Sequence, residues 1–477
     1  MTTRLAGVLM GVLVALIVAP LVASAHTISE KYSAPLPLVI YVAGAALAVA
    51  MSFIFVSLRQ RRAAAEASIA RPREVPRPVR WTLRTLGLLA WLWIMVQAFL
   101  GGNDPTADIG QIMLWVYGWV GVALVSALVG PVWAWLDPFS TMHLLLVGVG
   151  RRLGLLSAPD GDEGPFEERR YPARWGRWPA VIGFGIVVWL ELVAFVSGGR
   201  PLALVLLAYT LITLAGMAWF GRQAWRSNVE VFSVWFSVLG RLAPFALGGE
   251  PEDNRVVRRP FASGLFSTRW TSPELVLVTL GAGSIIFDGF SQTRLYFDLF
   301  GRIDLFGLPP AVFSTVILAT WFGLLLGIVL LVAGRIGIDA LCAGLLPVAV
   351  GYLIAHYFLT LLFDGQRILI ALNDPLVRGD SLLPYPLSGM TEPWLFLPAS
   401  LIWTVQLAAV VGGHVIGAWA GHAALAESPR GARLSSQMPL AVLMVVLTSL
   451  TLWSLGQAVI EQEPAAVLER KSVAEST

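Results

Sequence analysis

Residues 311–333 read AVFSTVILATWFGLLLGIVLLVA, and this stretch decides the class of fold. No charged residue interrupts it, and a helix of about twenty apolar residues spans a bilayer. Comparable stretches recur, so we predict about ten transmembrane helices, at 36–57, 84–101, 110–130, 179–197, 201–220, 273–292, 311–333, 340–363, 394–418 and 438–458. The expected fold is all-α, a polytopic bundle of transmembrane helices.

The composition leaves little material for a water-soluble domain. Of the 477 residues, 57% are hydrophobic and 13% are charged, and the mean hydropathy is +0.74. We therefore predict a single transmembrane domain over residues 26–460, followed by a polar C-terminal tail at 461–477. The lipid bilayer is the expected partner of most of this surface.

The positive charge of the chain is spread among its loops. The net charge is +3, but the arginines lie between apolar segments and form no continuous basic face, so nucleic acid is not an expected partner. Cys342 is the sole cysteine and lies in an apolar segment. An intramolecular disulfide and a zinc site built on several cysteines are therefore excluded.

The N-terminus is typical of a secretory signal peptide. Arg4 precedes an apolar run that ends near Val22, and Ala23-Ser24-Ala25 follows as an A-x-A cleavage pattern. We predict a signal peptide at 1–25, whose removal leaves His26 as the mature N-terminus. The alternative is that residues 5–25 remain as a further span.

Arginine asymmetry predicts the orientation. The segment 58–84 is rich in arginine whereas 101–109 has none, so the former is expected on the cytoplasmic side. Alternation then places the mature N-terminus outside. The remaining long connections are expected inside at 150–178, 221–272 and 422–437, and outside at 293–310 and 364–393.

Three ionisable residues lie inside the predicted spans at similar depth. Glu191, Asp288 and His356 are each about five to seven residues from the outer ends of their helices. A charged group at the bilayer centre costs about 2.5–3.5 kcal/mol on insertion scales, so each needs a partner. We expect them to converge as catalytic residues, and as ligands of a divalent metal or as proton carriers. The alternative is a purely structural role, in which His356 donates to a helix carbonyl and Glu191 is protonated or paired with arginine.

A second polar group is expected near the inner side, comprising Asp137, His143, His414 and His422. A spacing of eight residues rotates His422 by about 80° from His414 on a helix, which weakens the metal hypothesis. Gly413, Gly417 and Gly421 follow small-xxx-small spacing on the same helix. Close helix packing therefore explains that face.

Two intracellular connections begin alike. Asp137-Pro138-Phe139-Ser140 and Glu230-Val231-Phe232-Ser233 each follow a span and lead into an apolar stretch. An acidic residue at a helix N-terminus is stabilised by the helix dipole, so the pattern predicts a weak repeat of helices lying along the membrane surface. The alternative is chance similarity between two apolar stretches.

Familiar catalytic motifs do not occur in the chain. It contains no P-loop, no G-x-S-x-G, no H-E-x-x-H and no paired C-x-x-C. The nucleotide, serine-hydrolase, zincin and thiol routes are therefore unsupported.

The chain resembles bacterial multi-spanning proteins known as fenitrothion hydrolases, from about His26 to the last span. The similarity is carried by short motifs at 135–140 (WLDPFS), 287–291 (FDGFS), 356–358 (HYF) with 365–366 (GQ), 374–375 (DP) and 413–415 (GHV). Members of that family often have a His-Asp-Arg run where this chain has His422-Ala423-Ala424. Because of this departure, His422 is the residue to which a functional role of the family is least securely transferred.

The resemblance implies hydrolysis of an organophosphorus triester at its P–O aryl bond. A divalent metal held by Glu191, Asp288 and His356 would lower the pKa of a bound water and polarise a phosphoryl oxygen. A lipophilic small molecule would then reach the site through the bilayer. The alternative from another class is a transporter or an ion- or proton-binding protein that uses the same three residues.

Overall fold

The computed structural model describes most of the predicted transmembrane domain. Its described residues are 43–44, 71–101, 108–155, 170–194, 199–248, 254–300, 309–385, 387–389, 397–426 and 434–456. The predicted signal peptide, nearly all of the predicted span at 36–57, and the tail at 461–477 lie outside them.

The described part is 78% helical. Its helices are α3 (Arg77–Leu100), α4 (Ile109–Gln111), η2 (Ile112–Gly121), α5 (Val122–Leu128), α6 (Trp133–Leu136), α7 (Pro138–Arg152), η3 (Ala173–Trp175), α8 (Trp178–Leu192), α9 (Gly199–Phe220), α10 (Arg222–Asn228), α11 (Val231–Leu239), η4 (Ser263–Phe266), α12 (Ser272–Ser291), α13 (Arg294–Phe300), α14 (Pro310–Ile336), α15 (Ile338–Phe363), α16 (Arg367–Ala371), η5 (Leu387–Gly389), α17 (Ala399–Ala426) and α18 (Leu434–Leu455). The strands are β1 (Arg73–Glu74), β2 (Phe245–Leu247) and β3 (Arg255–Arg258).

The long helices agree with the predicted spans. Within the described residues, eight helical stretches are long and apolar enough to cross a membrane. They cover every predicted span from 84–101 onward except 179–197, which appears as the shorter α8, Trp178–Leu192. The stretch Ile109–Leu128 is continuous but contains the π-helical segment η2, whose end is marked by the bond from Val122 N–H to Tyr117 O.

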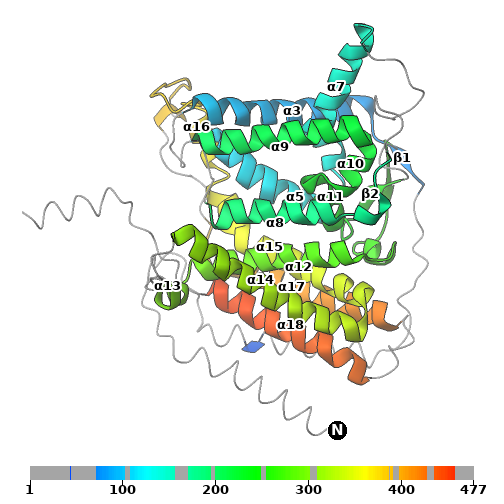
Figure 1. Ribbon diagram of the computed structural model, residues 1–477. Coiled ribbons are helices and arrows are strands. Elements are labelled where there is room, and N and C mark those ends of the chain that lie inside the picture. Colours follow the sequence, from blue (N-terminus) through cyan, green and yellow to red (C-terminus); the bar gives the residue numbers. More distant parts are fainter. Residues whose placement is uncertain are drawn as a thin grey trace, which may run out of the picture.

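The long helices lie side by side as a bundle, with α15 inside it (Figure 1). In the most apolar part of the stretch that contains α15, 83% of residues are buried, compared with 17% for α14. Exposed leucine, isoleucine and valine side chains follow α14 along its length. A helix that is apolar on all sides and exposed on one is suited to contact lipid, so α14 lies at the periphery.

The predicted inside and outside connections lie at opposite ends of the bundle. β1 pairs with β3 antiparallel, with Arg73 opposite Val256, and β2 pairs with the other edge of β3. This small sheet was not predicted, and it joins the two connections at 58–84 and 221–272. The helices α13 and α16 lie at the other end (Figure 1).

Glycines bring α15 and α17 into close contact. A Cβ atom on Gly413 would lie 2.6 Å from Pro347 O, and one on Gly417 would collide with Gly344 O. From the other side, a Cβ on Gly351 would collide with Ala409 O. The small-xxx-small spacing therefore marks a helix–helix contact, as predicted.

Acidic residues cap α7 and α11, as the repeated pattern predicts. Asp137 accepts from the backbone N–H of Phe139 and Ser140, and Glu230 accepts from those of Phe232 and Ser233. α7 runs crosswise to the spans (Figure 1). The prediction of a surface helix is wrong for α11, because most of its side chains are buried in the core.

Candidate functional site

Asp288 and His356 form a hydrogen-bonded pair between two spans. Asp288 lies in the last turns of α12 and His356 in α15, and His356 Nε2 is 2.9 Å from Asp288 Oδ2. Opposite a carboxylate, Nε2 carries the proton and donates it to the hydrogen bond. The His356 side chain is 14% exposed and the Asp288 side chain is 18% exposed. Asp288 and His356, which were predicted to lie at similar depth in the bilayer, are thus in direct contact.

Two further side chains hold the Asp288 carboxylate. Gln292 Nε2 donates to Oδ1 at 2.9 Å from the next turn of α12, and the Tyr357 hydroxyl donates to Oδ2 at 3.4 Å. Together with His356, they supply donors to both carboxylate oxygens. A carboxylate held by several donors keeps one orientation, so it can in turn orient the imidazole.

Glu191 lies close to this pair but does not bind it. It is in the last turn of α8 and lines a cavity of about 10 Å³ with Tyr357, Ser284 and Leu353 among others. This volume is close to the minimum that holds one water molecule. Among the described residues, Glu191 makes no hydrogen bond to Asp288 or His356. The structure therefore shows Asp288 paired with His356, and Glu191 as a neighbour that is not bonded to either.

The three residues are not arranged around a common centre. Within the described ranges, no group of three or more His, Cys, Asp or Glu residues is placed to hold a metal ion. His356 Nε2 and Asp288 Oδ2 face each other, so a shared metal would require these atoms to separate. The predicted metal site stays a prediction.

Gly289 of α12 lies next to the pair, and side chains from α15 and α18 come close to it. A Cβ atom there would lie 2.5 Å from Ser454 Oγ, 2.9 Å from the Tyr352 hydroxyl and 3.4 Å from His356 Cε1. Both hydroxyls are buried, and the two side chains lie close enough to interact with each other. They form a polar contact beside His356. Ser454 was not predicted as a neighbour of this site, because serines are common in spans.

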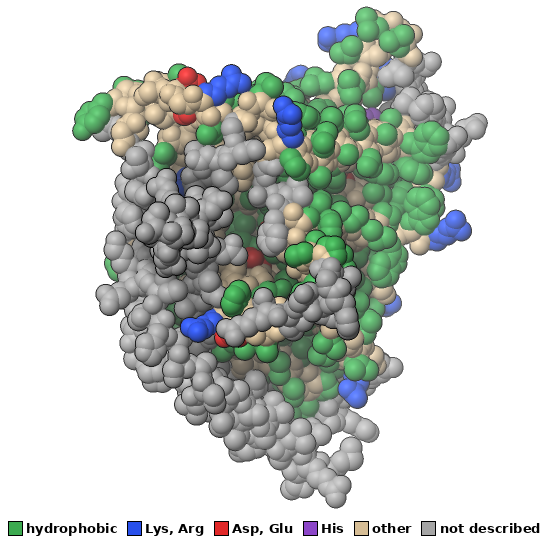
Figure 2. Space-filling view, turned by 60° about the vertical axis from the view of Figure 1, so that its left-hand side comes forward, with side chains coloured by type: hydrophobic (Ala, Val, Ile, Leu, Met, Phe, Trp, Pro, Cys, Tyr) green, Lys and Arg blue, Asp and Glu red, His purple; other side chains and the backbone are tan. Residues whose placement is uncertain are grey.

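The end of the site that was predicted to face outward carries aromatic and charged residues. Tyr296 of α13 packs edge-on against Phe287 and Phe290 of α12. Asp364 pairs with Arg367 at 3.3 Å beyond the end of α15. Figure 2 turns this end toward the reader and shows an acidic side chain in a recess. The pair therefore lies near the surface that was predicted to face outward.

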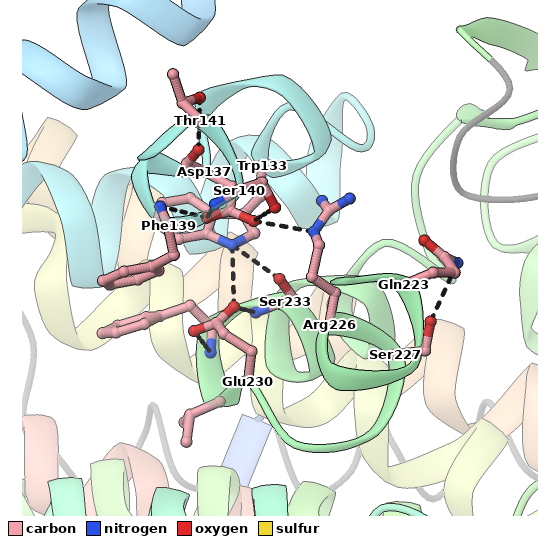
Figure 3. Close-up of polar contacts among 12 residues, drawn as sticks. Trp133, Asp137, Phe139, Ser140, Thr141, Gln223, Arg226, Ser227, Glu230 and Ser233 are labelled. Atoms are coloured by element: carbon pink, nitrogen blue, oxygen red, sulfur yellow. Dashed lines mark hydrogen bonds and ion pairs between the residues drawn. The ribbon is translucent and has the colours of Figure 1, made fainter. Parts of the chain in front are cut away.

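The second predicted group does not come together as one site. Asp137 caps α7 and pairs with Arg226 Nε of α10 at 2.9 Å (Figure 3). His414 Nδ1 donates to Val410 O of its own helix at 2.8 Å and is fully buried. His143 is buried on α7 and His422 on α17.

Sequence reasoning missed the polar network around Glu230. The Tyr209 hydroxyl donates to Glu230 Oε1 at 2.5 Å, and Trp133 Nε1 donates to Ser233 Oγ at 3.2 Å and weakly to Glu230 Oε2 (Figure 3). Burial and the nearby Asp137 charge raise the pKa of Glu230. The repeated acidic pattern was the only signal of this network in the sequence.

The large apolar cavity lies elsewhere. It has a volume of about 250 Å³ and is lined by α3, η2 and α6, with Trp91, Tyr117 and Trp133 in its wall. Neither Asp288 nor His356 lines it. A lipophilic molecule in this cavity would not contact the pair.

The chain matches no protein-family model, and neither a curated protein nor a solved structure matches it. Fold and composition define the class: a helical protein whose apolar helices are consistent with a multi-pass membrane protein.

Proposed function

We propose that the protein is an integral membrane hydrolase of a bacterial cytoplasmic membrane, with its mature N-terminus outside, and that it acts on lipophilic phosphotriesters. The observation that carries the proposal is the hydrogen bond between His356 and Asp288. An imidazole oriented by a carboxylate is the arrangement that general-base catalysis needs. The sequence resemblance supplies the substrate class.

The pair would act by moving one proton. Because Nε2 donates to Asp288, Nδ1 is the ring nitrogen that can accept a proton from water. The water oxygen attacks phosphorus, the P–O aryl bond breaks, and the imidazolium returns the proton to the aryl oxide. General acid–base catalysis of this kind contributes about 10²–10⁴-fold.

Tyr357 and Gln292 would hold the Asp288 carboxylate in position, since both donate to it. Glu191 would contact a water molecule in the small cavity that it lines together with Tyr357. A divalent metal would join the mechanism as a Lewis acid only if Glu191 moved toward the pair. Elemental analysis of the purified protein, with His356→Ala as the comparison, tests for that metal.

Nitrophenol release from an aryl dialkyl phosphotriester by the reconstituted full-length protein tests the hydrolase. We expect turnover in the wild type and a loss of about 10²-fold or more in His356→Gln. His422→Gln is the matched control, because His422 is a buried intramembrane histidine away from the pair. Equal rates in wild type and His356→Gln, with normal folding, would reject the role of the pair.

The second candidate is a proton-coupled transporter. It is favoured by a chain of polar groups: Glu191 and Tyr357 line one cavity of water size, and the Tyr357 hydroxyl donates to Asp288. Chains of this kind relay protons in membrane proteins. Flux of an ion or lipophilic solute across sealed liposomes, without product formation, would support it. Product formation without flux would support the hydrolase.

A further inference from the structure

Another cavity, at the end of the bundle predicted to be cytoplasmic, is lined by arginine. Its volume is about 310 Å³, and its wall includes Arg177, Arg226, Arg241 and Arg259. The wall is built by the N-terminal end of α8, by α10 and α11, by β2 and by the segment before α12. Small-molecule sites have volumes of about 300–1,000 Å³, so the cavity is large enough for a small ligand.

The carboxylates beside this cavity do not balance its positive charge. Glu274 Oε1 accepts from both Arg177 and Arg241 at 2.6 Å, and Asp137 pairs with Arg226. Arg259 donates to the carbonyl oxygens of Ala243 and Gly240, which carry no charge. The wall thus has more guanidinium groups than carboxylates to pair with them.

The guanidinium groups also disfavour one another. Burial, opposed by Glu274 and assisted by the nearby Arg177, lowers the pKa of Arg241. Burial and the Arg241 charge likewise lower the pKa of Arg259. Arginine nevertheless stays protonated in proteins. An anion in the cavity would relieve this repulsion and replace lost hydration.

Unused donors are present in the wall. Ser126 of α5 is fully buried and lines the cavity, and its hydroxyl has no hydrogen-bond partner among the described residues. In Figure 3 the two terminal nitrogens of Arg226 point away from Asp137, and no dashed line joins them to the other residues drawn. A buried hydroxyl without a partner is unfavourable, so a ligand that accepts a hydrogen bond from it is favoured.

We propose that this cavity binds a phosphate group. Arginine forks match phosphate oxygens in a bidentate manner, and Ser126 supplies a further donor. The phosphate can belong to a free anion or to the headgroup of an anionic lipid of the adjacent leaflet, because both present the same oxygens. The site is separate from Asp288 and His356, neither of which lines it.

Calorimetry with inorganic phosphate, at constant ionic strength and on the full chain in detergent, tests the free anion. Ser126→Ala and the double variant Asp137→Asn/Arg226→Gln should each weaken binding, the latter by about tenfold or more. The double variant removes the buried charges together, and asparagine still caps α7. Arg258→Gln is the control, since Arg258 is exposed beside Arg259 and does not line the cavity.

Native mass spectrometry after reconstitution in phosphatidylcholine with phosphatidylglycerol tests the headgroup. Selective retention of phosphatidylglycerol, lost in the double variant and kept in Arg258→Gln, identifies a lipid source. Saturable phosphate binding without lipid retention identifies a free anion. The proposal is overturned if neither probe binds, or if Arg258→Gln weakens binding as much as the cavity variants do, since that shows general attraction to a basic surface.

Discussion

At the residue scale, the pairing of Asp288 with His356 explains how both can lie within apolar helices. Lipid cannot solvate either group, but each satisfies the other at 2.9 Å. Gln292 and Tyr357 supply the remaining donors. The exposure that remains to both side chains allows a reactant to reach them.

Replacing Gly289 tests the packing around this pair. Gly289→Ala would place a methyl group 2.5 Å from Ser454 Oγ and 2.9 Å from the Tyr352 hydroxyl. We expect the free energy of unfolding to fall by about 1–3 kcal/mol, the usual effect of overpacking. Gly185→Ala on α8, where nothing lies within 4 Å, should have little effect in the same thermal unfolding assay. Partial recovery in Gly289→Ala/Ser454→Ala is expected, and a neutral Gly289→Ala would contradict this packing.

The contact between Asp288 and His356 was predictable because helix position fixes depth in the bilayer. The separation of Glu191 was not, because depth does not fix which way a side chain points around its helix. α8 also ends at Leu192 and not at the predicted residue 197, so Glu191 lies at a helix end. The approach of Ser454 on α18 to Gly289 beside the pair follows only from tertiary packing.

At the element scale, helix contacts and helix starts follow rules that the sequence carries. The spacing of Gly413 and Gly417 predicted the close contact of α17 with a neighbour, and α15 is that neighbour. The acidic residues Asp137 and Glu230 predicted two helix N-termini. The sheet was not predictable, because its strands are only two to four residues long and β1 pairs with β3, which is far away in the chain.

A substitution at Gly417 tests the contact between α15 and α17. In Gly417→Ala, the added methyl group meets the backbone oxygen of Gly344, which cannot rotate away. We expect a loss of about 1–3 kcal/mol in unfolding free energy. Gly412→Ala on the same helix has open space at its Cβ and serves as the matched control. Similar unfolding curves for the two variants would argue against this helix packing.

At the scale of the whole molecule, apolar flanks and opposite ends define how the protein would sit in a bilayer. The end that carries the small sheet includes the exposed Arg258, and α13 with Arg294 lies at the other end (Figure 1). The arginine bias of the segment 58–84 predicts that the sheet end is cytoplasmic.

Labelling with a membrane-impermeant maleimide tests this orientation. Cys342 is fully buried, so the background reaction is low. We expect Arg294→Cys to react in intact spheroplasts, and Arg258→Cys to react only after permeabilisation. The opposite pattern would invert the orientation, and reaction of both variants in intact spheroplasts would contradict a bundle that spans the membrane between these positions.

The most direct test of the account is a double-mutant cycle on phosphotriester turnover with Asp288→Asn, His356→Gln and the combined variant, all in the same liposomes. If the carboxylate acts only by orienting the imidazole, the combined variant should be no slower than His356→Gln alone, because groups that act as a unit are strongly non-additive. Losses that simply add, or single variants that turn over as fast as the wild type, would contradict a working Asp288–His356 pair.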